Sequence, residues 1–379
     1  MDRYLSKAIR EDLTSRIVIL TGPRQCGKTT LSQMLLEDYD YLNHDLAEHR
    51  VLLEQKAWDR ERRLVIFDEL HKMPDWKSWL KGIYDVEGIP PAMVVTGSAR
   101  LNAFRKVGDS LAGRHFNFRL HPLDLKEVLA FTDASPGEAF ERLLEVGGFP
   151  EPYLTGSRRF YNRWKRSHTD LILKEDLTTL TAVRDIQSIE TLIELLRRRV
   201  GSPVSANSLA RDLQKSPTTI QNWLQLLVDL YVIFRVSPYH KNIARALLKE
   251  PKYYFYDNAM VQGDEGVRLE NLVACALLKE AQRVVDVEGA DYDLHYIRDK
   301  EGREIDFLVT SQSQPYALVE VKWGEVDPSP HFGRFLADQN ILRTQVVGKA
   351  IRARSFPDGT RVEPAVRYLA ELSLPGVEG

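Results

Sequence analysis

The chain has 379 residues, 43% hydrophobic and 28% charged, which is the composition of an ordinary globular protein long enough for two or three domains. Its net charge of −2 excludes a polycation, so any nucleic-acid surface has to be a local patch. The two cysteines, Cys26 and Cys275, exclude a disulfide framework and are typical of a reducing cytoplasm.

The N-terminus carries charge where a signal peptide would be apolar, in the order Met1-Asp2-Arg3-Tyr4. No window approaches the run of about 18 apolar residues expected of a membrane-spanning helix. We therefore expect a cytoplasmic protein with no membrane partner.

A P-loop pattern, G-x-x-x-x-G-K-[ST], begins at Gly22, after an apolar strand over residues 17–20 and before an amphipathic helix over 28–36. Such a loop binds phosphate through backbone N–H groups, while Lys28 reaches the β and γ phosphates and the Thr29 hydroxyl binds Mg²⁺. The residues predicted to contact the nucleotide are Gly22, Pro23, Arg24, Gln25, Cys26, Gly27, Lys28, Thr29 and Thr30. The chain is therefore expected to bind a nucleoside triphosphate.

A second apolar strand, residues 64–67, ends in Asp68-Glu69. A carboxylate at a strand tip beside a P-loop holds Mg²⁺ through water, and this role is assigned to Asp68. Glu69 is placed to polarise the attacking water, so the site is expected to hydrolyse the nucleotide. An isolated Asp-Glu pair is more often a solvated strand end, but the position after a P-loop, with a strand-like segment at 41–43 between, favours catalysis.

Two catalytic candidates follow with their alternatives. The strand 93–96 runs into Gly97-Ser98, where Ser98 or Thr96 would sense the γ phosphate; a simple turn is the other interpretation. Arg114 follows a glycine and would stabilise the transferring phosphoryl group, in its own chain or from a neighbouring subunit. A surface ion pair is the equal alternative for Arg114.

Residues 126–200 are expected to be mostly helical and to form a lid or extension. Within them, residues 157–168 interleave aromatic with basic side chains, namely Arg158, Arg159, Arg163, Lys165 and Arg166. This mixture suits phosphate contacts and stacking on exposed bases. The alternative is an amphipathic helix with its aromatic residues in the core and its arginines in solvent.

The segment 201–240 has the pattern of a winged helix. Residues 205–214 predict a short helix, Ser216-Pro217 start a second one, and residues 231–236 follow as an extended run. The second helix has no Lys or Arg between residues 216 and 230, so its contribution to phosphate binding would be small. We therefore favour a packing module over a direct DNA reader.

Two predicted strands, 305–309 and 317–322, carry Asp306, Glu320 and Lys322. Residues two apart on a strand share a face, so Glu320 and Lys322 point the same way, as in the PD-(D/E)xK nucleases. Asp306 and Glu320 would bind a divalent metal ion, and Lys322 would orient the attacking water. Glu270, in an apolar helix that opens at Arg268, supplies the further acidic residue of such a site.

The alternative for these strands is a solvated charge ladder. Charges that interrupt an apolar segment are costly when unpaired, which favours the nuclease-like site. The residues do not decide whether such a site cleaves, or only binds nucleic acid or a metal ion.

These motifs together resemble a large prokaryotic family of AAA-type ATPases with a C-terminal domain related to restriction endonucleases. The matching segments are Thr21–Thr30, Phe67–Lys72, Thr96-Gly97-Ser98, Leu111–Arg114 and Gly147-Gly148-Phe149-Pro150. The resemblance covers nearly the whole chain and implies ATP and Mg²⁺ as ligands.

The fold expected from the elements and the resemblance is α/β. It comprises an AAA-type P-loop ATPase core at 1–125, a helical lid or extension at 126–200, a winged helix at 201–240 and a restriction-endonuclease-like α/β domain at 241–379.

The expected function is ATP hydrolysis coupled to DNA binding or processing, in a homo-oligomer if Arg114 acts between subunits. The alternative is a nucleotide-dependent switch whose inactive nuclease-like domain is a scaffold for a protein or nucleic acid. The sequence does not distinguish DNA from RNA.

Overall fold

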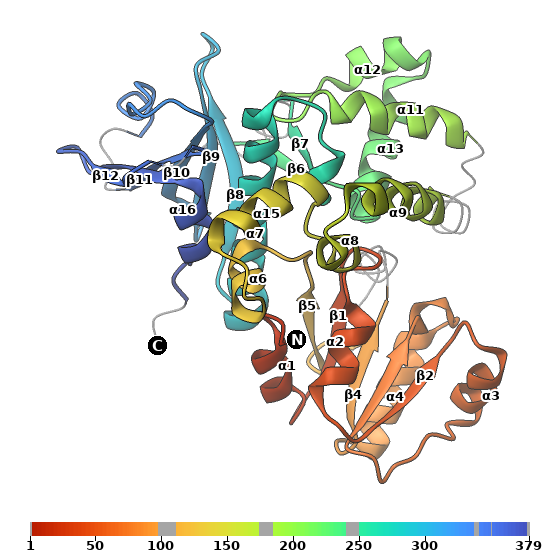
Figure 1. Ribbon diagram of the computed structural model, residues 1–379. Helices are drawn as coiled ribbons and strands as arrows, with labels where there is room; N and C mark the ends of the chain where they lie inside the picture. Colours follow the sequence, from red (N-terminus) through yellow and green to blue (C-terminus); the bar gives the residue numbers. More distant parts are fainter. Residues whose placement is uncertain are drawn as a thin grey trace. The chain divides into compact units, whose positions relative to one another are not determined.

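The computed structural model describes residues 2–97, 111–173, 185–239, 250–336, 341–349 and 351–376. Its contacts divide the chain into unit 1 (Met1–His121 with Asp229–Tyr231) and unit 2 (Pro122–Val228 with Val232–Gly379) (Figure 1). The predicted lid, winged helix and nuclease-like domain fall almost wholly within unit 2. Their separate boundaries stay a prediction.

Unit 1 is built on a five-stranded parallel sheet with the order β2-β3-β4-β1-β5. Its strands are β1 (Ile17–Thr21), β2 (Tyr39–Asn43), β3 (Leu64–Asp68), β4 (Ala92–Thr96) and β5 (His115–Arg119). Its helices are α1 (Ser6–Asp12), α2 (Lys28–Leu35), α3 (Ala47–Gln55), α4 (Trp76–Glu87) and the short 3-10 helix η1 (Leu70–Lys72). Every residue of β1, β3 and β4 is buried, as expected of central parallel strands covered on both faces.

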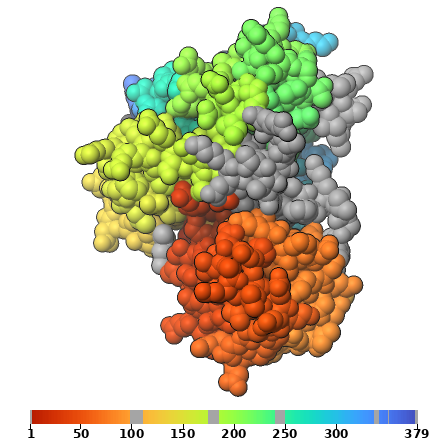
Figure 2. Space-filling model, turned by 90° about the vertical axis from the view of Figure 1, so that its right-hand side faces the viewer, coloured from red at the N-terminus to blue at the C-terminus, as the bar shows by residue number. Residues whose placement is uncertain are grey.

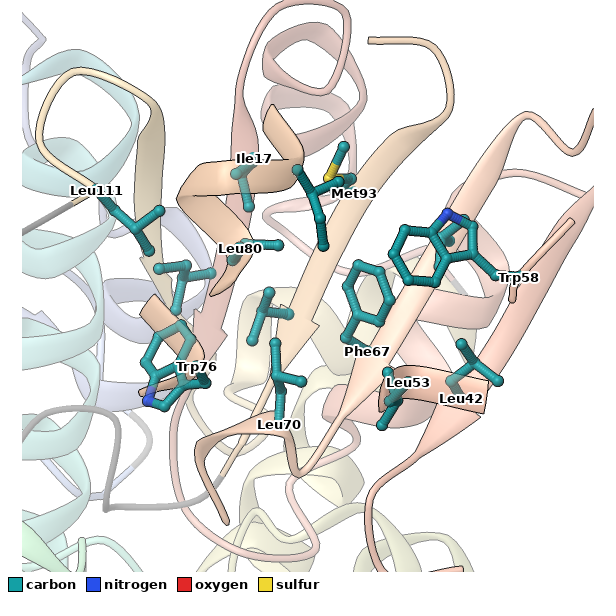
Figure 3. Packing of buried hydrophobic residues seen from close by; sticks show 14 residues of the cluster. Ile17, Leu42, Leu53, Trp58, Phe67, Leu70, Trp76, Leu80, Met93 and Leu111 are labelled. Carbon is teal, nitrogen blue, oxygen red and sulfur yellow. The ribbon is translucent and has the colours of Figure 1, made fainter. Parts of the chain in front are cut away.

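The core of unit 1 fixes the central strands against the helices. Trp58 and Phe67 meet edge to face with ring centroids 5.3 Å apart (Figure 3). Trp79 packs on both rings. Leu80 of α4 and Met93 of β4 belong to the same buried cluster. Aromatic pairs add about 0.5–1.5 kcal/mol beyond the area they bury, so this cluster holds β3, and with it the strand tip that carries Asp68.

The strand order brings the predicted nucleotide residues to one edge of the sheet. Parallel strands present their carboxyl ends together, so the P-loop after β1 meets the ends of β3 and β4. Because β4 lies between β1 and β3, Thr96 is in register with both Leu20 and Asp68. The strands expected at 17–20, 41–43, 64–67 and 93–96 and the helix at 28–36 are confirmed.

Unit 2 contains an eight-stranded mixed sheet with the order β12-β13-β11-β10-β9-β8-β6-β7. Its strands are β6 (Ile233–Pro238), β7 (Lys252–Phe255), β8 (Tyr292–Arg298), β9 (Glu304–Ser311), β10 (Gln314–Lys322), β11 (Leu342–Val347), β12 (Arg354–Ser355) and β13 (Thr360–Pro364). β8, β9 and β10 form an antiparallel meander, and β10 then pairs with β11 in parallel. The strands expected at 305–309 and 317–322 are therefore confirmed as β9 and β10.

The helices of unit 2 flank this sheet and continue into a helical region. They are α6 (Leu125–Phe131), α7 (Pro136–Val146), α8 (Pro150–Thr155), α9 (Arg158–Leu171), α11 (Ile186–Arg197), α12 (Ala206–Leu213), α13 (Pro217–Asp229), η4 (Asn258–Met260), α15 (Glu265–Glu288) and α16 (Ala365–Glu371). The expected start of a helix at Arg268 is wrong by three residues. α15 begins at Glu265 because the Asp264 side chain caps the N–H of Val267.

The two helices expected around residue 216 are confirmed as α12 and α13. Ser205 accepts from the N–H of Ser208 and Ser216 from that of Thr219, so each helix starts at a hydroxyl cap. The strand that follows, β6, pairs with β7 on one side and with β8 on the other. β7 is therefore the edge strand at this end of the large sheet, and β6 lies next to it.

Candidate functional site: a P-loop nucleotide site and a C-terminal carboxylate cluster

The P-loop has a backbone that only glycine allows at its first position. Gly22 has φ +146°, and a Cβ placed on it would lie 2.2 Å from the carbonyl oxygen of Leu120. Lys28 donates from Nζ to the carbonyl oxygens of Gly22 (3.1 Å) and Pro23 (2.7 Å). Its ammonium is thus held inside the loop that would receive a phosphate, and a bound phosphate would replace these carbonyl partners.

Asp68 is the centre of the hydrogen bonding at this sheet edge. Its Oδ2 accepts from the hydroxyls of Thr29 (2.9 Å) and Tyr41 (2.7 Å). Its Oδ1 accepts from the Thr96 hydroxyl and from the N–H of Glu69. The carboxylate is therefore fixed in direction by donors from three other strands and helices.

Thr29 and Asp68 together fit a magnesium ion. Mg²⁺ prefers hard oxygen ligands and is usually held by one or two protein groups plus phosphate oxygens and water. The hydroxyl and the carboxylate here are 2.9 Å apart, directly beside the P-loop. These two side chains would hold the ion, whose positive charge would offset that of the nucleotide phosphates.

Glu69 lies at the same edge in a left-handed backbone conformation, with φ +55°. Its N–H donates to the carbonyl oxygen of Thr96 over 3.1 Å, and its side chain is 18% exposed. Burial raises the pKa of Glu69; the charge of Asp68 adds to this, and Lys72, 3.5 Å away, opposes it. A general base works best when its pKa is near the working pH, so this environment suits the role predicted for Glu69.

The two predicted sensors have different outcomes. Ser98 lies outside the described residues, so its role stays a prediction. Thr96 is fully buried and donates its hydroxyl to Asp68. Thr96 therefore orients the carboxylate at this edge.

Arg114 is not brought to the P-loop of its own chain. It precedes β5, and its carbonyl accepts from the N–H of Ile17, at the start of β1. The P-loop follows Thr21, at the other end of this five-residue strand and about 13 Å away. Arg114 instead pairs with Asp85 through two hydrogen bonds of 2.5 and 3.1 Å, which is the surface ion pair weighed as an alternative. A catalytic role from a neighbouring subunit stays a prediction.

Two residues at this site were not predicted. Tyr41 orients Asp68 from β2. Burial, together with the hydrogen bond to Asp68, raises the pKa of Tyr41 to about 12, so it stays a donor. Arg3 is buried and donates to the carbonyl oxygens of Cys26 (2.9 Å) and His121 (2.7 Å). The sequence contains a weak signal for Tyr41, which lies on a predicted strand beside the apolar Leu42. It contains no signal that Arg3, in the N-terminal segment, contacts the P-loop.

The C-terminal candidates do come together in unit 2. Asp306 on β9 accepts from the N–H of Val321 at Oδ2 (2.8 Å), and its own N–H donates to Glu320 Oε2 (3.3 Å). Lys322 lies 3.0 Å from Glu320 Oε1, on the same face of β10. Glu270 on α15 lines a hollow of about 370 Å³ together with Asp306 and Lys322.

A residue that the sequence did not single out lies at the centre of this carboxylate cluster. The Nζ of Lys252 is 2.5 Å from Glu304 Oε1, 3.4 Å from Glu270 Oε1 and 3.8 Å from Asp306 Oδ1. Its side chain is 0% exposed. The signal for Lys252 was a charge inside the aromatic run Lys252-Tyr253-Tyr254-Phe255, and for Glu304 its place two residues before Asp306 on one strand face.

The surroundings of this cluster shift the pKa of Asp306 and of Lys252. Burial raises the pKa of Asp306 well above its usual range, and the charges of Glu270 and Glu320 add to it. Burial lowers the pKa of Lys252, but the carboxylates of Glu270, Asp306 and Glu304 outweigh this and raise it overall. Lys252 is therefore an ammonium ion at any physiological pH.

Helix α9 resolves the two interpretations of the basic segment in part. Tyr161 and Trp164 are buried, and the Trp164 ring stacks on His168 with centroids 4.4 Å apart, so neither can stack on a base. Arg159, Arg163 and Arg166 are exposed on the opposite side of α9. The helix lies at the surface of unit 2 (yellow-green in Figure 2). Within the described part of the chain, none of these three arginines forms an ion pair.

Comparison with protein families assigns the N-terminal part of the chain. Residues 14–129 match the AAA domain family, and the P-loop, Thr29, Asp68 and Glu69 all lie within this range. Together with the parallel sheet and the phosphate-loop geometry, this defines a AAA-type P-loop ATPase domain. Residues 137–266 and 265–360 match two domains of unknown function, DUF8612 and DUF4143.

The chain is also similar in sequence to curated relatives that are described as uncharacterized proteins. An uncharacterized protein of Mycobacterium tuberculosis is 26% identical over 370 residues, covering 94% of this chain and 82% of the relative. One of Methanocaldococcus jannaschii is 23% identical over 349 residues, covering 82% and 76%.

Among solved structures, Thermotoga maritima RuvB aligns with 61% of this chain and 87% of its own, at 18% identity and a TM-score of 0.32. Drosophila ORC bound to DNA aligns with 67% and 81%, at 14% identity and a TM-score of 0.24. TM-scores this low do not establish a shared fold. Among the helices of the described ranges, none has the length and apolar character needed to cross a membrane.

Proposed function

We propose that this protein is a Mg²⁺-dependent ATPase that couples ATP hydrolysis to DNA binding in the cytoplasm. The observation that carries the proposal is the meeting of Lys28, Thr29, Asp68 and Glu69 at one edge of a parallel sheet. Lys28 would stabilise charge on the β and γ phosphates, and Glu69 would accept a proton from the attacking water. Asp68 and Thr29 would hold the metal ion.

The DNA part of the proposal is supported by the exposed arginines of α9. Arg159, Arg163 and Arg166 are spaced i, i+4 and i+7, so they share one helix face. Exposed arginines without carboxylate partners are free to contact phosphates, and such contacts dominate the affinity of proteins for nucleic acids. Helix α13 lines a hollow of unit 2 with Gln221 and Gln225 and carries no Lys or Arg. Uncharged side chains add little to phosphate binding, which supports its proposed role as the packing helix of a winged-helix module.

The proposed nuclease-like fold of the C-terminal part is supported by the order of its elements. Helix α15 packs against β8 and β10, the strands β8–β10 form an antiparallel meander, and β11 joins in parallel. Asp306 lies on the middle strand of the meander, and Glu320 and Lys322 lie on the last one. Residues 323–336, the described part of the connection to β11, form turns rather than a helix.

The test is ATP turnover with and without single-stranded and duplex DNA, at two salt concentrations. We expect DNA to stimulate turnover and the binding of DNA to weaken steeply with salt. The triple variant Arg159→Glu/Arg163→Glu/Arg166→Glu should lower the slope of log K against log[salt] by about 2–3. Turnover that is indifferent to DNA, with no salt-sensitive binding, would contradict the coupling.

A matched control for this experiment is Lys300→Glu/Arg352→Glu/Arg361→Glu, which reverses three exposed basic residues elsewhere in unit 2. It should leave both DNA binding and the salt slope near those of the unchanged protein. An equal loss in both variants would show that only the net charge matters, and the assignment of α9 as the contact surface would fail.

A second candidate is favoured by the pairing of Lys252 with the C-terminal carboxylates. It is a nucleotide-dependent switch whose nuclease-like domain is a binding scaffold without cleavage activity. Incubating DNA with the protein in Mg²⁺ or Mn²⁺, with and without ATP, distinguishes the two. Cleavage that disappears in Glu320→Ala would establish DNA processing, whereas no cleavage under any condition would favour the scaffold.

A further inference from the structure

A nuclease-like C-terminal domain implies a divalent metal ion held by Asp306 and Glu320, but the oxygens of these side chains are already engaged. Asp306 Oδ2 accepts from the N–H of Val321, and Glu320 Oε2 accepts from the N–H of Asp306. Glu320 Oε1 pairs with Lys322 at 3.0 Å. The remaining oxygen, Asp306 Oδ1, faces Lys252 at 3.8 Å. Each of the four carboxylate oxygens of Asp306 and Glu320 therefore already faces an N–H donor or a lysine ammonium.

Lys252 provides the positive charge that a metal ion would otherwise supply. Its ammonium contacts Glu304, Glu270 and Asp306, which come from two different elements, β9 and α15. It reaches them from β7 with no solvent exposure, below the ring of Tyr296 at 5.3 Å. The Tyr254 hydroxyl donates to the same oxygen of Glu270 over 2.7 Å. The ammonium is therefore enclosed by its partners.

We infer that the ammonium of Lys252 is the permanent cation of this carboxylate cluster, in place of a divalent metal ion. Buried carboxylates require a counter-charge with good hydrogen-bonding geometry, and a lysine fixed on β7 supplies it without leaving. Mg²⁺ demands near-octahedral oxygen ligands at about 2.0–2.1 Å, and a fixed ammonium beside Asp306 would repel it. Within the described ranges, no group of three or more His, Cys, Asp or Glu side chains is arranged to hold a metal ion.

This inference has a consequence for DNA at the neighbouring hollow. The hollow of about 370 Å³ is lined by Asp264, Glu265, Glu270 and Asp306, with Lys322 as a basic neighbour. Without a divalent ion, this acidic lining repels a phosphate group instead of attracting one. The cluster would thus act as a structural tie between β7, β9, β10 and α15, and not as a cleavage centre.

The first experiment is Mn²⁺ binding to the nucleotide-free full-length protein, followed by electron paramagnetic resonance. Asp306→Asn and Asp68→Asn are measured in parallel, so that ions at the C-terminal cluster are distinguished from ions at the P-loop. We expect no Mn²⁺ whose binding depends on Asp306 up to millimolar concentration. One tightly bound Mn²⁺ per chain that is lost in Asp306→Asn but kept in Asp68→Asn would overturn the inference.

The second experiment removes the ammonium in Lys252→Met. Breaking a buried pair leaves carboxylates facing one another, so the melting temperature should fall by about 6–20 °C. Mn²⁺ should now recover much of this loss, because the cluster again needs a cation. In Lys252→Arg, which keeps the charge, Mn²⁺ should change the melting temperature no more than it does in the unchanged protein. A stable Lys252→Met protein that ignores Mn²⁺ would contradict the inference, and if that variant does not fold, the Mn²⁺ titration of the unchanged chain still decides.

The expectation of a metal ion rests on the proposed nuclease-like fold, but the outcomes of the tests are separable. Cleavage of DNA that requires Glu320 and a divalent ion would refute the role of Lys252 and leave the coupling of ATP turnover to DNA intact. Turnover indifferent to DNA would refute the coupling and leave the Mn²⁺ result standing.

Discussion

The hydroxyl of Thr29 donates a hydrogen bond to Asp68 over 2.9 Å, although 39 residues separate the two in the chain. The contact exists because Thr29 lies in the first turn of the helix after β1, Asp68 ends β3, and both strands are parallel members of one sheet. It is the physical link between the phosphate loop and the carboxylate that would hold magnesium.

Replacing Lys28 tests the phosphate loop. In Lys28→Ala, the ammonium held by the Gly22 and Pro23 carbonyls is absent, so ATP turnover should fall about 10²–10³-fold or more. The measurement is steady-state phosphate release, with circular dichroism to establish that the variant is folded. Turnover retained in a folded Lys28→Ala protein would refute the assignment of the P-loop.

Replacing Glu69 tests the general base. Glu69→Gln keeps the size of the side chain but cannot accept a proton, so we expect ATP to bind and turnover to fall about 10²–10⁴-fold. Because burial raises the pKa of Glu69, turnover by the unchanged protein should decline as the pH falls through that pKa. Glu48→Gln, an exposed change on α3, is the control. Near-normal turnover in Glu69→Gln would assign the base to another group.

Arg3 is predicted to support the P-loop from outside the motif. Its guanidinium joins the Cys26 carbonyl, within the loop, to the His121 carbonyl, and Arg3→Ala leaves both without this donor. The free energy of unfolding should fall by about 2–5 kcal/mol, with weaker nucleotide binding. Lys7→Ala, an exposed change on α1, should alter stability by less than about 0.5 kcal/mol. Equal effects in the two variants, measured by urea denaturation, would contradict the prediction.

Asp257 gives unit 2 a pH-dependent stability. It is buried, accepts from the Tyr161 hydroxyl over 2.8 Å, and lies so close to Gly147 that a Cβ there would be 2.3 Å from Oδ1. Burial raises the pKa of Asp257 from 3.8 to about 6, although the hydrogen bond from Tyr161 opposes the shift. The folded state therefore keeps a proton that the unfolded chain releases.

The sign of the effect follows from this uptake. The stabilisation that the protonated Asp257 contributes to the folded state is complete below pH 3.8 and is lost as the pH rises to about 6. This change amounts to about 3 kcal/mol in the free energy of unfolding. In Asp257→Asn this dependence should disappear. The measurement is the difference in unfolding free energy between the two proteins from pH 4 to pH 7; a constant difference would show that Asp257 does not titrate in this range.

Local sequence was sufficient for the elements that carry the nucleotide site. The segment Gly22–Thr29 is contiguous, and the apolar runs before it and before Asp68 have the composition that buried parallel strands require. Asp306, Glu320 and Lys322 could also be placed correctly on their strands, because the alternation of side chains along a strand fixes which residues share a face.

Other placements depended on contacts between distant segments. The sequence left open which face of α9 its aromatic residues occupy, and packing against Phe149 and His168 turned Trp164 inward. Arg114 follows a glycine turn like a catalytic arginine, yet the pairing of β1 with β5 puts it at the far end of the sheet.

What the sequence by itself determined is therefore the chemistry of the P-loop and the identity of the strands, since both depend on neighbours in the chain. Only the tertiary structure decided that Arg3 supports the loop and that Lys252 lies among Glu270, Glu304 and Asp306. The reason is that the partners of a buried charge lie on distant strands and helices. The periodicity of the local sequence does not determine which of these elements will be nearby.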